Sequence, residues 1–273
     1  MGFVHFSRTI QVKKRLLNST IGLLAPALLL CGQVSHAGPV NGPDGDVSPN
    51  VIFGTGGNAN GSFTGQGQNN IEVALRGKQR YPAANIFNYD LDKTYTFDST
   101  VLTTNPANRS VFNFEWSINV DQGGTTGDIL SDFLYLLSVD TDASAGVTYA
   151  SIDPFNTPGY FDHALGTNTT LAGQGIESTS EAELSTNMAS YNVAQQSSNL
   201  GFGFSADPDA PGIYDFKMEV FSLQNVLLSS AEITVIVEPV PRSQVPVPAT
   251  LPVLLGGIGA LGFFARRRKS KSA

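Results

Sequence analysis

The stretch that decides the fold is Val111 to Asp121, which reads VFNFEWSINVD. Apolar and polar side chains alternate along its whole length. One face carries the apolar residues Phe112, Phe114, Trp116, Ile118 and Val120. A period of two is typical of a half-buried strand in an antiparallel sheet. We expect Trp116, the only tryptophan, to anchor the core; a sugar-stacking platform is the alternative.

The same period recurs on both sides of this stretch, between turns rich in Gly, Asn and Asp. Residues 133–139 are apolar on both faces, as in a central strand, and residues 178–194 predict one helix capped by Ser180. The other predicted strands cover residues 71–76, 94–98, 200–204, 213–222 and 226–237. The sequence therefore predicts a mainly β fold, an antiparallel β-sandwich with one short helix.

A Gly-, Asn- and Pro-rich segment, Gly38 to Gln68, precedes the first of these strands. Within it, Val51 to Phe53 could form a short edge strand. Gly54 to Gly57 has the composition of a nucleotide-binding loop. A phosphate-binding loop, however, runs from a strand directly into a helix. Another glycine-broken stretch follows here, so we interpret it as a flexible loop.

The charge of the central region is strongly negative. All 23 acidic residues lie between Asp44 and Glu238, where only six residues are basic, giving a formal charge of −17. Such a domain repels nucleic acid and anionic lipid, and it repels anionic polymers unless cations screen or bridge the charges. The single cysteine is Cys31, so the region after it has neither a disulfide nor a thiol nucleophile. About 200 residues still suffice for a core without such crosslinks.

The end of the sequence has the features of a membrane stop. An uncharged apolar run of 15 residues, Leu251 to Ala265, precedes the basic residues Arg266, Arg267, Arg268 and Lys269. As a helix it would be about 22 Å long, which is short for a bilayer core of about 30 Å. The basic residues would stay in the cytoplasm, leaving the preceding domain across the membrane. A buried C-terminal helix is the alternative, but four glycines disfavour it.

The beginning of the sequence has the features of a signal peptide. Basic residues between Arg8 and Arg15 precede an apolar run, Ile21 to Cys31, and a small-x-small cleavage site, Ser35 to Ala37. An N-terminal anchor is disfavoured by Pro26 within the short apolar run. A lipoprotein with a lipidated Cys31 is a second alternative.

The tail Val245, Pro246, Val247, Pro248 and Ala249, the apolar run and the arginine cluster follow one another in a specific order. In this order they resemble the PEP-CTERM sorting signals of Gram-negative bacteria. Val247 stands where the named motif has Glu, as in an aliphatic variant of the class. The resemblance implies an exosortase-type sorting protease as a partner and membrane contact through the C-terminal helix before processing. It also implies export through an inner-membrane intermediate to the cell surface or the exterior.

The central region also resembles one recurring group of PEP-CTERM proteins, for example in Phe114 to Asn119 and Tyr135 to Asp142. This resemblance implies a β-rich surface protein associated with matrix and exopolysaccharide. The group has no established activity that could be assigned to this chain. The predicted organisation is a signal peptide (1–37), an exported β-sandwich domain (38–237), a Pro-rich linker with the sorting motif (238–248), and a transmembrane stretch with a basic tail (249–273).

Pairs of aspartates recur at strand ends. In Asp140-Thr-Asp142 and Asp207-Pro-Asp209, oxygen-bearing side chains are spaced as in a calcium loop, although the EF-hand glycine and glutamate positions are not matched. The alternative is that aspartate ends strands and starts turns by bonding its own backbone. We predict no other cofactor.

Three classes of function follow from these features. The first is a structural matrix protein without enzyme activity. The second is a calcium-dependent glycan-binding module that uses aromatics such as Tyr81, Tyr160 or Phe161. The third is a secreted hydrolase, either with His163, the only histidine after His36, as its base or with two carboxylates that flank a glycosidic bond. A loop histidine bonded to a neighbouring carbonyl is the alternative for His163.

Overall fold

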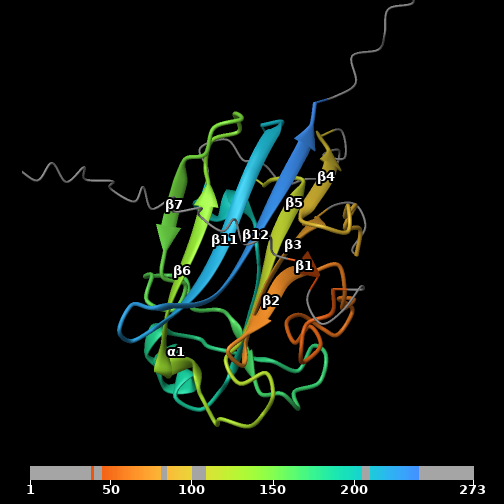
Figure 1. The fold of residues 1–273 in the computed structure, drawn as a ribbon. Coiled ribbons are helices and arrows are strands. Elements are labelled where there is room, and N and C mark those ends of the chain that lie inside the picture. Colours follow the sequence, from red (N-terminus) through yellow and green to blue (C-terminus); the bar gives the residue numbers. More distant parts are fainter. Residues whose placement is uncertain (1–37, 40–44, 81–84, 100–108, 205–209, 240–273) are drawn as a thin grey trace, which may run out of the picture. The chain divides into compact units, whose positions relative to one another are not determined.

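The computed structural model describes residues 38–39, 45–80, 85–99, 109–204 and 210–239. The described strands are β1 (Gly38–Pro39), β2 (Thr64–Gln68), β3 (Ile71–Gln79), β4 (Thr94–Asp98), β5 (Phe112–Asn119), β6 (Phe133–Asp140), β7 (Tyr149–Ile152), β8 (Ala164–Gly166), β9 (Ile176–Glu177), β10 (Val193–Ser198), β11 (Gly212–Ser222) and β12 (Leu227–Glu238). They form two sheets (Figure 1). Sheet A has the order β1-β2-β3-β5-β10-β8-β9, and sheet B has the order β4-β12-β11-β6-β7.

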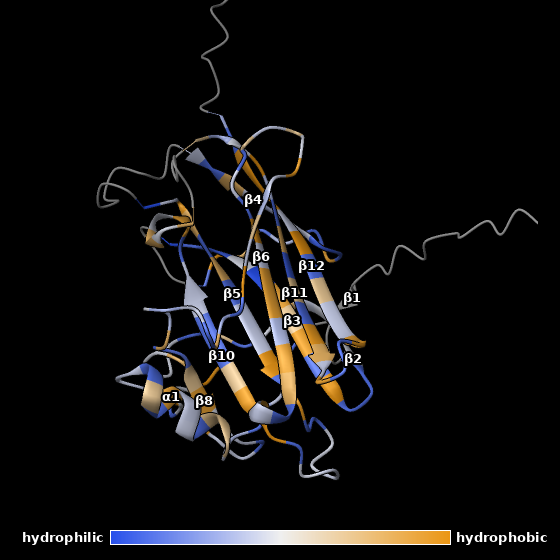
Figure 2. Cartoon of the chain, turned by 90° about the vertical axis from the view of Figure 1, so that its left-hand side faces the viewer, coloured by the Kyte–Doolittle hydropathy of each residue, from blue (hydrophilic) through white to orange (hydrophobic). Residues whose placement is uncertain are grey.

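The core lies between the two sheets. Phe114 on β5 stacks on Phe216 of β11 with ring centroids 4.6 Å apart, and Phe97 of β4 stacks on Phe112 at 5.8 Å. These side chains belong to one buried apolar cluster drawn from both sheets. Figure 2 shows hydrophobic residues running along β3, β6 and β12. The predicted mainly β fold is therefore confirmed, and the apolar face of residues 112–118 lies in the core as expected.

One strand pair departs from the purely antiparallel prediction. β4 pairs with β12 in parallel, from Thr94 opposite Thr234 to Asp98 opposite Glu238. The other pairs among the described strands are antiparallel. A hairpin fixes two strands as antiparallel, but β4 and β12 lie far apart in the sequence and share none. The sheet is therefore mixed at this edge.

The expectation that β5 is half-buried was wrong. All its residues are buried, including Asn113, Glu115, Ser117 and Asn119 on the polar face. The reason is a further layer on the outer side of sheet A. Residues 45–63, which we name the cover segment, lie over this face and form a second apolar cluster with sheet A. The cluster consists of Val47, Val51, Ile52, Phe53, Phe63, Ala74, Ala164 and Val193.

The cover segment is held by irregular hydrogen bonds rather than by strand pairing. The Ile52 N–H donates to Gln195 Oε1 (2.8 Å), and its carbonyl accepts from Gly175 N (2.8 Å). Gly173 packs directly against the backbone of the cover segment. A Cβ added to it would lie 2.1 Å from Gly56 N, so no other residue fits at this position. The predicted edge strand at residues 51–53 is thus absent, because side chains and loop backbone satisfy these groups. Residues 54–57 form an exposed turn within the cover segment.

A buried ion pair fastens the cover segment to the sheet. Arg76 of β3 and Glu115 of β5 both have fully buried side chains, and Arg76 Nε donates to Glu115 Oε2 (2.7 Å). Arg76 Nη1 also donates to the carbonyls of Ala59 (2.9 Å) and Gly61 (2.7 Å) in the cover segment. Burial raises the pKa of Glu115, but Arg76 and Lys78 outweigh this and hold it below its ordinary value. The carboxylate therefore stays charged inside the protein.

The predicted helix exists but is shorter than expected. α1 spans Glu181–Met188, and the Ser180 hydroxyl accepts from Glu183 N (3.2 Å), as the capping pattern predicts. The helix does not continue to Ala194, because Val193 and Ala194 pair in β10 between β5 and β8. Residues 200–204 were expected to be a strand. Instead, Leu200–Phe202 form a 3-10 turn, and the Asn199 side chain caps it by accepting from Gly201 N through Oδ1 (3.0 Å).

Trp116 is a core anchor, as predicted. It is fully buried and contacts the rings of Phe155 and His163, with the His163 centroid 5.1 Å away. Its burial contradicts the sugar-stacking alternative. His163 is also fully buried, and its Nε2 donates to the carbonyl of Pro154 (2.6 Å). Burial lowers the pKa of His163, so the ring is held neutral.

A first prediction concerns the buried ion pair. Glu115→Gln leaves Arg76 and Lys78 without their anion, so we expect the free energy of unfolding to fall by about 3–5 kcal/mol. Urea denaturation of the purified protein measures this change. The matched control is Glu232→Gln, which removes the half-exposed pair with Lys93 and should cost less than about 1 kcal/mol. Equal losses in both variants would contradict the role given to Glu115.

A second prediction concerns His163. Its folded pKa lies below the ordinary value of 6.5, so the unfolded chain binds more protons below that pH. Stability should therefore be fully present above about pH 6.5 and fall at lower pH, with a slope approaching about 1.4 kcal/mol per pH unit. Urea denaturation at about pH 7 and about pH 5.5 measures the slope. His163→Phe should flatten it, and an unchanged slope would rule out His163 as its source.

Candidate functional site

The structure places the first predicted aspartate pair in the turn after β6. Asp140 Oδ1 accepts from the backbone N–H groups of Asp142 (3.1 Å) and Thr148 (2.9 Å). Asp142 Oδ1 accepts from Ser144 N (2.9 Å), which lowers the pKa of Asp142. Asp140 is buried and Asp142 is exposed. Hydrogen bonds of this kind are typical of aspartates that shape a turn. They leave some lone pairs of each carboxylate unused.

The second pair, Asp207 and Asp209, lies outside the described residues. The strand that follows it does contact the first turn, because Ile213 N donates to the carbonyl of Ala143 (3.2 Å). Gly212 is required at this contact, since an added Cβ would lie 2.2 Å from the Ala143 oxygen. The turn after β6 and the start of β11 are therefore side by side. In the parts of the chain that the structure describes, no three His, Cys, Asp or Glu side chains are grouped to hold a metal ion.

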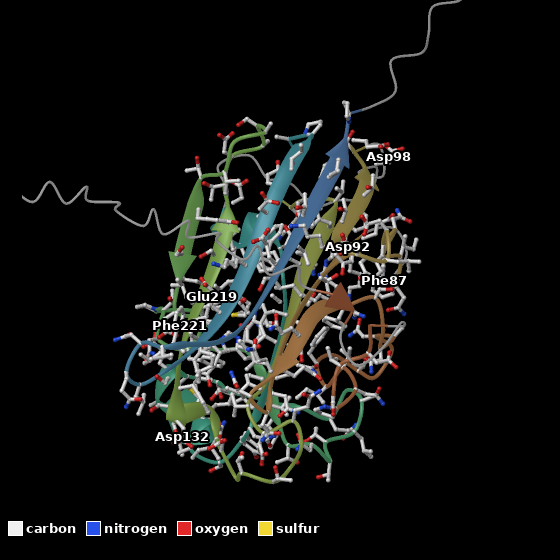
Figure 3. The ribbon with its side chains drawn as sticks, viewed as in Figure 1. Phe87, Asp92, Asp98, Asp132, Glu219 and Phe221 are labelled. Atoms are coloured by element: carbon white, nitrogen blue, oxygen red, sulfur yellow. The ribbon has the colours of Figure 1, made fainter. Side chains whose placement is uncertain are left out.

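Four carboxylates gather around Tyr149 on sheet B, and we name this group the acidic field. Burial raises the pKa of Tyr149 on β7 to about 12, and the nearby carboxylates of Glu232, Asp215, Asp140 and Glu219 add to the effect. Figure 3 shows Glu219 and Phe221 on β11 in this sheet. Lys217 and Lys93 each pair with one carboxylate, at 2.7 Å from Glu219 and 3.1 Å from Glu232. The face repels anions, in agreement with the charge count.

The proposed catalytic base lies in the interior, and two of the proposed stacking residues are only partly exposed. The described bond of His163 is to a backbone carbonyl, and Ser198 bonds the Tyr160 hydroxyl rather than the imidazole. Tyr160 and Phe161 pack against the core and are only partly exposed. Tyr81 lies outside the described residues.

A polar cluster that the sequence analysis missed lies under the cover segment. Lys78 of β3 is buried, and its Nζ forms an ion pair with Glu115 Oε1. The same Nζ donates to Asn58 Oδ1 (2.9 Å) in the cover segment. One signal could have revealed it. Arg76 and Lys78 alternate with Leu75 and Gly77 along one strand, so both cations lie on the face opposite the apolar Val73 and Leu75, which is the face of Glu115.

The predicted sorting segment follows the last strand. β12 ends at Glu238, and Val245 to Ala249, the apolar run and Arg266 to Arg268 lie outside the described residues, as does the signal peptide. Among the helices that the structure describes, none is long and apolar enough to cross a membrane.

Comparison with family models identifies the C-terminal segment. Residues 244–269 match the PEP-CTERM protein-sorting motif. No curated protein and no solved structure matches the chain. The motif implies export through the membrane to the cell surface and processing by an exosortase. The chain therefore carries a C-terminal PEP-CTERM protein-sorting motif, which follows the last strand of a β-rich domain.

Proposed function

We propose that the chain is a structural protein of the cell surface or extracellular matrix that associates with exopolysaccharide and has no enzyme activity. The observation that carries this proposal is the attachment of the sorting motif to β12. This strand pairs with β11 on one edge and β4 on the other. Six residues, 239–244, separate its end from Val245, which is about 20 Å when extended. Processing at the motif thus acts beside a folded domain and leaves its sheets intact.

The chemistry of the domain supports a structural role. His163, the base that a serine hydrolase would use, is buried and bonded to a backbone carbonyl. The domain has no cysteine after Cys31, so it needs neither oxidation nor a thiol cofactor to reach its fold. Its stability rests on two apolar clusters and a buried ion pair.

The acidic field determines which polysaccharide the domain can approach. The carboxylates around Tyr149 and the formal charge of −17 disfavour an anionic polymer unless cations bridge the two. Neutral polysaccharide meets no such barrier. The association should therefore be weakest with anionic polymer at low ionic strength.

A third prediction tests sorting. Changing Pro246 and Pro248 to Ala should stop recognition of the motif, so the protein should accumulate in the inner-membrane fraction with Arg266 to Arg268 still attached. Cell fractionation and C-terminal sequencing of the product measure this. The matched control changes Pro239 and Pro241, which lie before the motif in the same linker, and should be sorted normally. A parent protein recovered outside the membrane with the arginine cluster intact would contradict trimming.

The calcium-dependent glycan-binding module stays the second candidate. The contact between Ala143 and Ile213 supports it, because it brings the turn of Asp140 and Asp142 beside the strand that follows Asp207 and Asp209. A fourth prediction follows from this candidate. Calorimetric titration of the purified protein with calcium should give binding heat that Asp140→Asn removes and Asp132→Asn, at a separate site, retains. A glycan array with and without chelator then tests the ligand. A calcium titration of the unmutated protein that gives no heat would rule out this function.

A further inference from the structure

The amine of Lys78 lies between a carboxylate and a carboxamide. Its Nζ is paired with Glu115 Oε1 on one side and donates to Asn58 Oδ1 (2.9 Å) on the other. The amide group of Asn58 is fixed as well, because its Nδ2 donates to the carbonyl of Phe53 (3.3 Å). A nucleophile, an electrophilic carbonyl group and a proton acceptor thus meet at one point.

The amine and the carboxylate at this point are shielded from water, while Asn58 is partly exposed. The side chain of Glu115 is fully buried and that of Lys78 is 7% exposed. The ring of Phe53 lies 5.7 Å from Lys78 Nζ, and the rings of Phe63 and Phe87 flank the Arg76 guanidinium at 4.1 Å and 4.5 Å. Figure 3 shows Phe87 at the side of the domain that carries the cover segment. Burial lowers the pKa of the Lys78 ammonium, although Glu115 opposes this. A desolvated lysine is the form in which this side chain acts as a nucleophile.

The charges at this point do not balance, although a second buried carboxylate, Glu72, lies on the same face of β3 and accepts from Ser48 N (2.9 Å) and Gln122 Nε2 (2.8 Å). Arg76 and Lys78 bring two cations to the single carboxylate of Glu115. An excess charge in a low-dielectric interior is costly, and a reaction that removes it is favoured. Arg76 cannot lose its charge in a protein, whereas lysine can. Conversion of the Lys78 amine to a neutral amide would leave Arg76 and Glu115 as one matched pair.

From this geometry we propose that Lys78 and Asn58 join in an intramolecular amide crosslink, with Glu115 as the proton-transfer group. Glu115 takes a proton from the Lys78 ammonium, and the free amine attacks the Asn58 carboxamide carbon. The new bond joins Nζ to Cγ, and the bond from Cγ to Nδ2 breaks. Glu115 returns its proton to the leaving nitrogen. The second proton lost from Nζ leaves with the ammonia as ammonium, so no oxidant or other reactant is needed.

Arg76 acts as a positioning residue in this step. Its Nε and Nη2 hold Glu115 Oε2, at 2.7 Å and 2.6 Å, which directs Oε1 to Lys78. The fold supplies the orientation that makes an otherwise slow amine–amide exchange fast, since the two groups are held in contact within one molecule. The product would tie the cover segment to β3 by a covalent bond. This chemistry is independent of the proposed sorting and matrix role.

A fifth prediction tests the crosslink on the full chain as the cell exports it. Trypsin cuts after Arg76 and Arg80, so the crosslinked protein should give a branched peptide in which residues 77–80 are joined through Lys78 to the peptide that ends at Arg76. Its mass should be that of the two linear peptides after loss of one ammonia. Tandem mass spectrometry then locates the branch at Asn58. Ammonia loss elsewhere, for example at Asn60-Gly61, gives no branched peptide.

Variants separate the crosslink from folding. Lys78→Arg keeps a cation beside Glu115 but has no primary amine that can form the amide, and Asn58→Ala removes the carboxamide; both should fold and give only linear peptides. Asn50→Ala changes another asparagine of the cover segment that bonds Asn60 rather than Lys78, and it should retain the branched peptide. Circular dichroism confirms that each variant is folded. Only linear peptides from the folded parent, or a branch that survives in Asn58→Ala, would overturn the proposal.

Discussion

The ion pair between Arg76 and Glu115 is the interaction on which the outer layer of the domain depends. Neither charge reaches water, so each needs the other, and the remaining donors of Arg76 need the carbonyls of Ala59 and Gly61. The cover segment is therefore bound by the sheet, and the sheet cannot bury its charges without the cover segment. Two layers of strands thus become three layers of structure, with an apolar core on one side of β5 and a mixed polar and apolar one on the other.

Much of the fold follows from the period of two in the sequence. Residues 111–121, 213–222 and 226–237 form strands where predicted, and Trp116 occupies the core. The cover segment could not be predicted in this way, because Val51 to Phe53 bind sheet A through Gln195 and Gly175, which are distant in the sequence. The parallel pairing of β4 with β12 could not be predicted either, because these strands lie far apart in the sequence. Short-range patterns identify strands, whereas long-range contacts decide what covers them.

The candidate sites also differ in how far the sequence alone reveals them. The sorting motif is local and contiguous, so its residues are evident from the sequence alone and match a known motif. The cluster of Asn58, Lys78 and Glu115 is drawn from the cover segment, β3 and β5. Glu115 was expected on the polar face of a half-buried strand, where glutamate is ordinary. Only the burial of that face gives the cluster its unusual chemistry.

The position of β12 has a mechanical consequence. A pull on the end of β12, where the sorting segment begins, is directed along this strand, at right angles to the hydrogen bonds that join it to β11 in antiparallel register from Gly212 to Phe221. Such a force cannot open the bonds one after another. It has to slide the whole strand past its neighbours at once, so the domain should resist tension applied through its C-terminal end.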